Sequence, residues 1–579
     1  MQYNVGMYVA TVPNRNSPPT YLLRESFREN GKVKNRTLAN LSNLPLTQIQ
    51  LIRRVLKGEE LVPVDDAFRI TRSLPHGHVQ AVLHMIDQLE LPRLIASRPC
   101  RERDLIVALI AQRILHPSSK LASTRLWKNT TLAEELRVAD ADVNEVYHAL
   151  DWLLARQKRI ENKIAKRHLA HGDHVLYDVS SSSYTGRTCL LARFGHNRDG
   201  RRDLPCIVYG VITDDAGRPV AVDVYPGNTG DPATVPDQVD KLKERFGLEY
   251  VVVVGDRGML TQAQIGKLRQ RQGVGWISAL RSKAIRKLID IGRVERSLFD
   301  EVNLAEISSP DFPGERLVAC YNPILADRRC KKRKELLAAT EAKFERIAAE
   351  VARRTKKPLG KDEIALKVGR VWNKFKVGKH FELTIEDSRF QWERKQPAID
   401  REAALDGIYV IRTSEPADRL SAEDAVRGYK RLADVEQAFR SLKGLDLLVR
   451  PIHHRLNDRV RAHIFVCLLA YYVQWHLKQA WASLLFTDEH LAEHRAKRDP
   501  VASAQPVAEV QAKKVARQTE AGHQIQSFRT LLAELGTQCR NTCEFGETES
   551  TIRFTKLTDS TPLQSEAFRL LEQHRSQPK

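Results

Sequence analysis

The strongest constraint on the fold is a run of four valines, Val251 to Val254, which is followed by Gly255 and Asp256. The run is short for a helix, and β-branched residues favour strands. Because no polar residue alternates with the valines, both faces of such a strand must be covered. The run therefore predicts a buried central strand of an α/β sheet.

The segments around this run have the patterns of further sheet elements. His174 to Asp178 reads as a strand, and a hairpin is expected around the turn residues Asp214 to Gly217. Its strands are Ile207–Thr213 and Pro219–Tyr225, a helix follows at Val235–Phe246, and the strand pattern resumes at Asp406–Arg412. This succession predicts a mixed α/β sheet.

The 579 residues are enough for about three to five structural units. We divide the chain into six ranges by the changes of pattern along it. They are a small β unit at 1–76, a helical DNA-binding or linker domain at 77–170, the first part of the α/β core at 171–282, an insertion at 283–404, the second part of the core at 405–480, and a C-terminal region at 481–579.

The N-terminal unit contains Asn30-Gly31 between two strand-like runs, Tyr21–Arg28 and Lys32–Leu38. Asn-Gly is a strong signal for a tight hairpin, because both turn positions need positive φ. The basic residues of this hairpin could lie along a DNA backbone or form a solvated edge. They are Arg24, Arg28, Lys32, Lys34 and Arg36.

Helices are expected on both sides of the core. Asp142 with Glu145 three residues later has the spacing of a capping box at the start of a long helix. Residues 490–525 are polar and linker-like, and a last hairpin is expected at 543–555. Other predicted helices are Arg103–Leu115, Ser421–Lys443, Val460–Leu477 and Pro562–Gln573.

Composition narrows the class of partner. The formal net charge of +21 favours a polyanion, and nucleic acid first, because Lys and Arg release phosphate counterions on binding. The longest apolar run, Ile464–Val473, is too short to span a membrane, and eight irregularly spaced cysteines suit a reducing cytoplasm. No secretory signal and no P-loop motif is visible, so we expect no membrane and no nucleotide cofactor.

Two carboxylates occupy strand positions where a charge is costly, Asp178 and Asp256. Either could be an ordinary turn or cap residue. At the ends of two neighbouring strands, however, their charges would repel unless a cation paired them, and hard oxygen ligands favour Mg²⁺ or Mn²⁺.

A third carboxylate, Glu436, lies on the predicted helix 421–443. Steps of seven residues place Tyr429, Glu436 and Lys443 on one side of that helix. Glu436 also falls among Leu432, Val435 and Phe439, which form an apolar stripe. The alternative is an exposed Glu436–Arg440 pair of small stabilising effect.

These residues together resemble the DDE insertion-sequence transposases whose signature helix carries Tyr, Arg, Glu and Lys. The resemblance covers about residues 173–475. It extends through Tyr177-Asp-Val-Ser180, Gly195-His-Asn-Arg-Asp199, Tyr225-Pro-Gly-Asn-Thr-Gly-Asp231, Gly255-Asp-Arg-Gly258 and Arg450-Pro-Ile-His-His454. It implies an RNase H-like core, interrupted between Asp256 and Glu436 by an insertion domain.

One position departs from the family pattern. The signature places Arg three residues after Tyr, but position 432 is Leu, and the nearest arginine is Arg431. On a continuous helix Arg431 points about 200° away from Tyr429. Arg440, one turn beyond Glu436, is therefore the better candidate for the phosphate contact.

The resemblance implies cut-and-paste transposition of a bacterial insertion sequence by a cytoplasmic, nucleoid-associated enzyme. Asp178, Asp256 and Glu436 would be catalytic and hold two Mg²⁺ (or Mn²⁺) ions, with a hairpin-ended DNA intermediate. The partners expected are double-stranded DNA, at the element ends and the target, and a second copy of the chain in a homodimer. The candidate DNA-binding residues are Tyr429, Arg440, Lys443, Arg431 and Arg257.

Three points stay open at this stage. A transposase-derived DNA-binding protein without catalysis, or a structure-specific nuclease with the same core, would share most of these features. Trp372 and Trp392 in the insertion could stack a flipped base, although core packing is favoured for both. Gly195–Asp199 and Thr229–Asp231 could shape the mouth of the active site or be plain turns.

Overall fold

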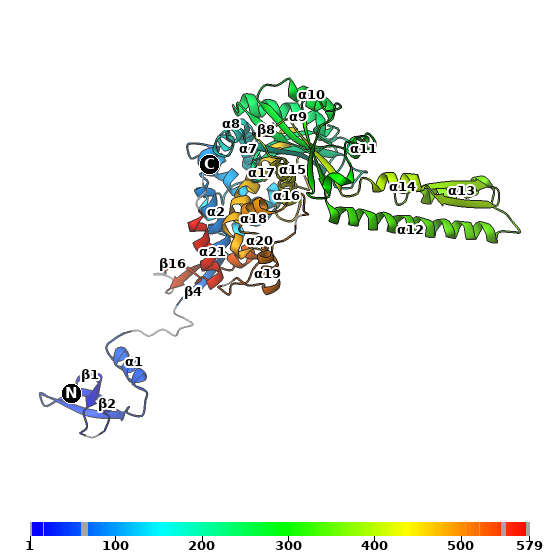
Figure 1. The fold of residues 1–579 in the computed structure, drawn as a ribbon. Coiled ribbons are helices and arrows are strands. Elements are labelled where there is room, and N and C mark those ends of the chain that lie inside the picture. Colours follow the sequence, from blue (N-terminus) through cyan, green and yellow to red (C-terminus); the bar gives the residue numbers. More distant parts are fainter. Residues whose placement is uncertain are drawn as a thin grey trace. The chain divides into compact units, whose positions relative to one another are not determined.

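The fold is that of a computed structural model, which describes residues 3–15, 17–59, 68–503, 505–519, 521–545 and 552–574. The chain forms two compact units. The first comprises Met1–Ser73 with Arg540–Thr558, and the second comprises Leu74–Cys539 with Asp559–Lys579. Figure 1 shows the elements of both units along the chain.

The first unit contains an antiparallel sheet of β1 (Tyr3–Val12), β2 (Thr20–Glu29) and β3 (Lys32–Asn40), followed by α1 (Leu46–Leu56). The predicted Asn-Gly hairpin is confirmed, because Asn30 and Gly31 join β2 to β3 with φ of 49° and 75°. The second sheet of this unit has the order β16 (Ile552–Leu557), β15 (Cys539–Phe545) and β4 (Arg69–Pro75), which confirms the predicted last hairpin.

The second unit is built on an eight-stranded sheet of order β10-β11-β14-β9-β8-β5-β6-β7. Within it β5 pairs parallel with β8 and β8 parallel with β9, whereas β6 and β7 are antiparallel. Strands β7-β6-β5-β8-β9 therefore have the order and directions of an RNase H-like sheet. The strands are β5 (His174–Ser183), β6 (Cys206–Thr213), β7 (Pro219–Pro226), β8 (Val251–Val254), β9 (Val274–Ala279), β10 (Leu304–Ile307), β11 (Arg316–Tyr321) and β14 (Ile408–Thr413).

The four valines form β8 in the middle of this sheet, as predicted, and each is at most 2% exposed. Helix α17 (Asn457–Ala480) is buried along nearly its whole length and packs against β7, α4 and α7. No helix in the described ranges is both long enough and apolar enough to cross a bilayer. The helices that precede β5 are α2 (Gly77–Gln88), α3 (Leu91–Ile95), α4 (Arg101–Leu115), α5 (Lys120–Leu126), α6 (Leu132–Glu135), α7 (Val143–Leu154) and α8 (Gln157–His168).

The capping box at Asp142 is present: its side chain accepts from the backbone of Asn144 and Glu145, and Glu145 accepts from the Asp142 backbone. The prediction of one long helix after this capping box is wrong. It breaks between Leu154 and Gln157 into α7 and α8. The break lets α8 turn its buried face onto β7.

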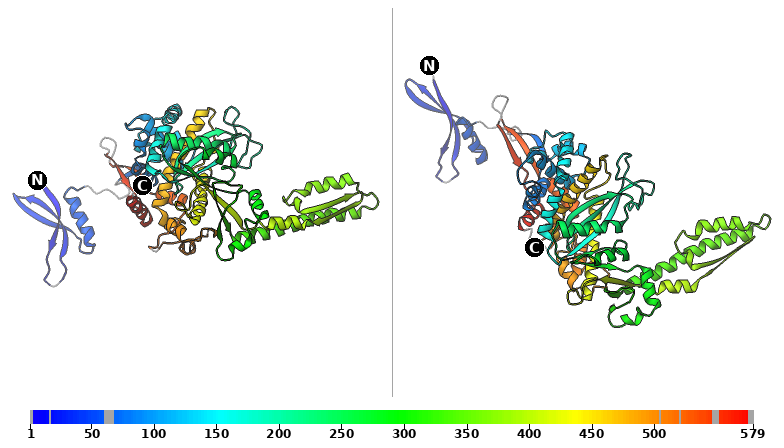
Figure 2. Two further views of the ribbon diagram at one scale, coloured as in Figure 1. Left: turned by 45° about the horizontal axis from the view of Figure 1, so that its top comes forward. Right: turned by 90° about the horizontal axis from the view of Figure 1, so that it is seen from above.

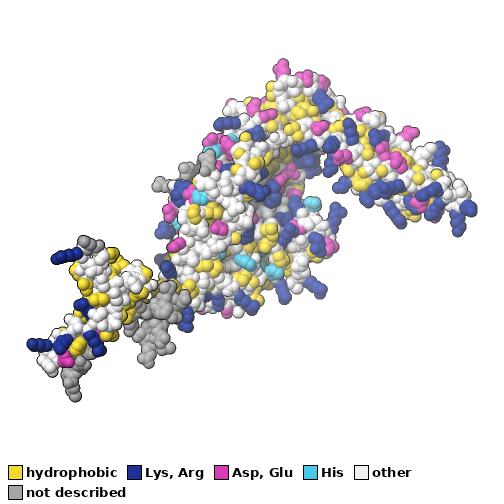
Figure 3. Space-filling view, turned by 90° about the horizontal axis from the view of Figure 1, so that it is seen from below, with side chains coloured by type: hydrophobic (Ala, Val, Ile, Leu, Met, Phe, Trp, Pro, Cys, Tyr) yellow, Lys and Arg dark blue, Asp and Glu magenta, His cyan; other side chains and the backbone are white. Residues whose placement is uncertain are grey.

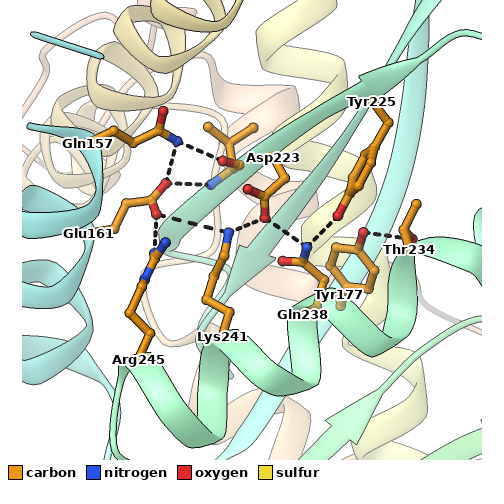
Figure 4. Close-up of polar contacts among 10 residues, drawn as sticks. Gln157, Glu161, Tyr177, Asp223, Tyr225, Thr234, Gln238, Lys241 and Arg245 are labelled. Atoms are coloured by element: carbon orange, nitrogen blue, oxygen red, sulfur yellow. Dashed lines mark hydrogen bonds and ion pairs between the residues drawn. The ribbon is translucent and has the colours of Figure 1, made fainter. Parts of the chain in front are cut away.

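A buried polar network joins α8 to the sheet (Figure 4). The Glu161 side chain is 0% exposed and accepts from the Gln157 amide at 2.8 Å and the Val222 backbone at 3.1 Å. It also pairs with Arg245 and, at 4.0 Å, with Lys241. Since this carboxylate is satisfied on both oxygens, the network fixes α8 against β7.

The network continues to Tyr225 on β7, and a separate hydrogen bond beside it involves β5, the strand that carries Asp178 (Figure 4). Lys241 pairs with Asp223, and the Gln238 amide donates to Asp223 at 2.7 Å and to the Tyr225 hydroxyl at 2.6 Å. The Tyr177 hydroxyl donates to Thr234 at 2.9 Å. These partners lie on α9 (Asp231–Asp240) and its π-helical continuation η3 (Lys241–Arg245), so the helix predicted at 235–246 holds β5 and β7 together.

The range assigned to the insertion, 283–404, divides into two parts. Strands β10 and β11 join the large sheet through β14. The remainder, α12 (Pro323–Arg353), α13 (Lys361–Trp372), β12 (Phe381–Glu386), β13 (Arg389–Arg394) and α14 (Gln396–Ala403), has its own core and stands apart from the sheet in both views of Figure 2. Trp372 and Trp392 pack against that core, with the Trp392 ring 5.7 Å from Phe344, so core packing explains both.

The helix predicted at 421–443 is interrupted. It forms α15 (Ala422–Lys430) and α16 (Leu432–Lys443), with Arg431 between them. The range 490–525 is also less featureless than predicted, since it includes α18 (Leu491–Lys497) and α19 (Ala508–Ala516). The other helices of this unit are α10 (Gln262–Arg269), α11 (Ser282–Asp290), α20 (Phe528–Gly536) and α21 (Pro562–Gln573).

Candidate active site

The register between β5 and β8 brings two carboxylates together. Leu176 on β5 is the partner of Val254 on β8, and the strands are parallel. Asp178 and Asp256 each follow two residues later, so the parallel pairing gives them equivalent positions on adjacent strands. Asp256 lies just beyond the end of β8, but Asp178 is the fifth of the ten residues of β5, so the prediction that both lie at strand ends is wrong for Asp178. The Val179 backbone donates to Asp178 at 2.7 Å, and the Gly258 backbone donates to Asp256 at 3.2 Å.

The carboxylate of Asp178 is electrostatically strained. The pKa of Asp178 is raised to about 6, mainly by burial; the charges of Asp256 and Asp231 act in the same direction, whereas the Val179 hydrogen bond and Arg198 lower the pKa. A cation between Asp178 and Asp256 would relieve both the burial and the repulsion.

Tyr429 connects α15 to this pair. Its hydroxyl donates to Asp256 at 3.1 Å. Burial, and then the negative charge of Asp256, raises the pKa of Tyr429, so the phenol keeps its proton and remains a donor. The charge of Glu436 also acts on Tyr429, which places Glu436 within electrostatic range of the same site.

Lys443, at the end of α16, reaches the other strand. Its ammonium donates to Ser180 at 3.1 Å and pairs with Asp199 at 2.9 Å. Burial lowers the pKa of Lys443, and Asp199 opposes that effect. Tyr429 and Lys443 thus contact neighbouring strands at the same edge of the sheet.

Glu436 is not part of the apolar stripe, and that part of the sequence analysis is wrong. Val435 and Phe439 are buried, Leu432 is half-buried, and Glu436 is exposed. The buried stripe of α16 runs through 435, 438, 439 and 442. Glu436 lies about 100° around the helix from Val435, so its carboxylate faces outward.

The three candidate arginines have different surroundings. Arg431 pairs with Asp215 in the β6–β7 turn at 3.0 Å. Arg440 is exposed and makes no ion pair with any residue that the structure describes. Arg257 is exposed beside Asp256, and its carbonyl accepts from Arg281 at 3.2 Å.

Sequence reasoning did not assign roles to several residues near the site. Arg198 pairs with Asp231, and both act on the pKa of Asp178. Asp199 pairs with Lys443 and with Arg450. The motif Gly195–Asp199, whose residues could either shape the site or form a plain turn, was the sequence signal that pointed to Arg198 and Asp199.

A preformed metal site is not evident. Within the described part of the chain, no three His, Cys, Asp or Glu side chains lie close enough together to hold a metal ion. Asp178 and Asp256 nevertheless fit one, because they are adjacent hard oxygen donors, and Asp178 is half-buried beside the like charge of Asp256. Glu436, on the exposed face of α16, is outside this pair.

Basic side chains cover much of the insertion. Figure 3 shows dark blue Lys and Arg side chains along it and beside a hollowed part of the surface where acidic side chains are also visible. The basic stretch at Arg328–Lys334 is partly used internally, since Arg333 is buried and pairs with Asp406. Arg328, Lys331, Lys332 and Lys334 are exposed.

Comparison with known families gives the class of protein. Residues 173–473 match the model described as "Transposase DDE domain", which covers more than half of the chain. The chain therefore belongs to the DDE transposases and is a DNA-modifying enzyme by class. Residues 9–62 match the "IS1634 family transposase, N-terminal domain", so the protein is a DDE transposase of an insertion sequence.

Other comparisons add little. No curated protein matches the chain. A cryo-EM structure of the piggyBac transposase synaptic complex with hairpin DNA is similar at a TM-score of 0.34 and 10% identity, over 79% of this chain and 76% of that chain. At this score the likeness supports no argument about function.

Proposed function

We propose that this protein moves its element by a cut-and-paste reaction, in which Asp178, Asp256 and Glu436 are the catalytic carboxylates. The observation that supports this most is the β5–β8 register, which sets Asp178 beside Asp256 with Tyr429 bonded to Asp256. Membership of the DDE transposases supports the same assignment.

In this proposal Asp178 and Asp256 hold divalent metal, two Mg²⁺ or Mn²⁺ ions in all, and Glu436 completes the ligand set when DNA binds. Bound metal would activate the attacking hydroxyl and stabilise charge on the leaving oxygen. Tyr429 keeps Asp256 oriented by its hydrogen bond. Lys443, Arg440 and Arg257 contribute positive charge for the phosphates near the cut, and Arg431 is a weaker candidate.

The resemblance to the family further implies a homodimer on DNA and a hairpin-ended intermediate. The N-terminal unit, with exposed Arg28 and Lys32, is the proposed reader of the element ends. A nuclease with the same core would cut without joining. The products of the reaction therefore distinguish the two functions.

The test uses the full chain, the DNA that flanks its gene, and Mg²⁺. The wild type is expected to give excised and joined products. Asp178→Asn, Asp256→Asn and Glu436→Gln are each expected to lower cleavage by at least about a thousandfold while end binding changes little, since removing one essential charge costs several kcal/mol in the transition state. Glu423→Gln, a change at an exposed glutamate of α15, is the control.

A second measurement does not depend on activity. Titration calorimetry with Mn²⁺ in the absence of DNA is expected to detect binding to the wild type and its loss in Asp178→Asn and Asp256→Asn. Near-normal cleavage by any one of the three variants would remove that residue from the proposed set.

A further inference from the structure

A buried aspartate next to the site holds two cations at once. The side chain of Asp199 is 2% exposed, and one of its oxygens pairs with Lys443 at 2.9 Å and with Arg450 at 2.7 Å. Its other oxygen accepts from the Ser183 backbone at 2.8 Å and from the Ser183 hydroxyl at 2.9 Å. One carboxylate therefore faces two positive charges, which leaves a net charge of +1.

The loop that carries Asp199 is built to hold it in place. A Cβ at Gly195 would lie 2.0 Å from the carbonyl of Gly227, so only glycine allows this approach. Asn197 is buried, accepts from the Asp199 backbone at 3.0 Å and donates to the Arg201 carbonyl at 2.7 Å. The loop thus fixes the aspartate before any ligand arrives.

The two cations border a pocket of about 480 Å³. Ser183, Thr185, Leu445 and Leu448 also line it. Leu445 is 80% exposed, so its apolar side chain is open to a ligand. Arg450 is 40% exposed, so its guanidinium remains accessible from the pocket.

We propose that Asp199 is a positioning residue, and that it holds Lys443 and Arg450 as a two-cation seat for one phosphate of the bound DNA strand. The leucines offer an apolar surface for the sugar or base of the same nucleotide. A phosphate is the chemistry that fits, because two adjacent cations provide donors for several of its oxygens. This inference rests on the proposed function. It adds Arg450 to the residues that contact DNA, and Asp199 as the residue that positions Lys443 and Arg450.

The experiment measures the affinity of the full-length protein for flanking DNA at several salt concentrations. Simple electrostatics predicts that removing an acidic charge near DNA strengthens binding. A positioning role predicts the reverse, since Lys443 and Arg450 must then be ordered on binding. We expect Asp199→Asn to weaken binding about tenfold, and Arg450→Ala to weaken it similarly and reduce the slope of log affinity against log salt by about 0.9.

Asp203→Asn is the matched control, because Asp203 lies in the same loop but pairs with exposed Arg201. It should bind DNA as the wild type does. A double-mutant cycle separates positioning from general destabilisation: Asp199→Asn should add little to Arg450→Ala with Lys443→Ala. Thermal melting identifies any variant that is misfolded, and Asp199→Glu then provides a second test, with partial recovery expected.

Three outcomes would overturn the inference. They are unchanged or tighter binding by Asp199→Asn, full additivity in the cycle, and displacement of DNA by millimolar inorganic phosphate at constant ionic strength, which would make this a site for free phosphate. If the wild type cleaves its ends while Asp199→Asn binds normally, the inference fails and the proposed function stands. If the wild type does not bind its ends, both fail.

Discussion

Arg440 and Arg431 give the sharpest test of how α16 meets DNA. Arg440 is exposed and lies one turn beyond Glu436. Arg431 lies at the break between α15 and α16 and pairs with Asp215. A charged contact to phosphate contributes about 1 to 3 kcal/mol. Arg440→Ala is therefore expected to slow end cleavage by about ten- to a hundredfold.

Arg431→Ala should have a much smaller effect. The side chains of Arg431 and Asp215 are 36% and 32% exposed, and solvent-screened pairs of this kind contribute only about 0.2 to 1 kcal/mol to stability. We expect less than about a threefold change in cleavage. Asp215→Asn is the control, because it breaks the same pair and should reproduce the effect of Arg431→Ala.

The assay is single-turnover cleavage of flanking DNA, with melting temperatures measured in parallel. A large defect in Arg431→Ala, with Arg440→Ala near normal, would refute the reasoning. It would mean that the arginine of the family signature has moved by one position and that Arg431 leaves Asp215 to reach DNA.

Three further predictions concern stability and DNA recognition. Glu161→Gln should lower the melting temperature by about 2 to 4 °C, because breaking the buried ion pair costs about 3 kcal/mol of unfolding free energy in a unit of about 490 residues. A fall of less than about 1 °C would show that the hydrogen bonds from Gln157 and Val222 are enough for the side chain at position 161. Burial lowers the pKa of Lys120 to about 7, so a charged Lys120 destabilises the folded state at pH 7 and below. Lys120→Met should therefore raise the melting temperature by about 1 to 3 °C in that range, and the gain should shrink as pH rises from 7 towards the ordinary lysine value of 10.5. A gain that grows with pH would contradict this prediction. The double change Arg28→Ala with Lys32→Ala should reduce the slope of log affinity for the element ends against log salt by about 2. Lys34→Ala removes a lysine that already pairs with Glu29, so it should reduce the slope less. Equal effects would place recognition elsewhere.

The parts of the fold that could be predicted from the sequence are those that depend on residues close together in the chain. The valines of β8, the turn at Asn30-Gly31 and the capping box at Asp142 each depend on neighbouring residues, and each is present. Strand β9 was not predicted, since Val274-Gly-Trp-Ile-Ser-Ala279 gives only a short apolar pattern. Its place beside β8 is decided by pairing with a distant segment.

The candidate site was predictable in its residues but not in their orientation. The nearness of Asp178 and Asp256 was predictable because their two strands are neighbours and run in the same direction, although Asp178 lies within β5 and not at its end. Gly428, in the last turn of α15, is a weak local signal for the break at Arg431, and contacts from elsewhere in the chain, Arg431 with Asp215 and Asp434 with Arg495, accompany it. Leu432, Val435, Glu436 and Phe439 all lie within α16, so the error at Glu436 came from drawing the apolar stripe too wide and not from the break.

The insertion begins and ends at neighbouring positions of the sheet, so it could be removed without disturbing the strands. Strand β11 ends at Tyr321 and β14 begins at Ile408, and these two residues are direct partners in neighbouring antiparallel strands. A two-residue turn could join them without changing any strand of the sheet. Replacement, lengthening or exchange of the 86 residues between these two would thus leave the strands of the eight-stranded sheet with their own hydrogen bonds.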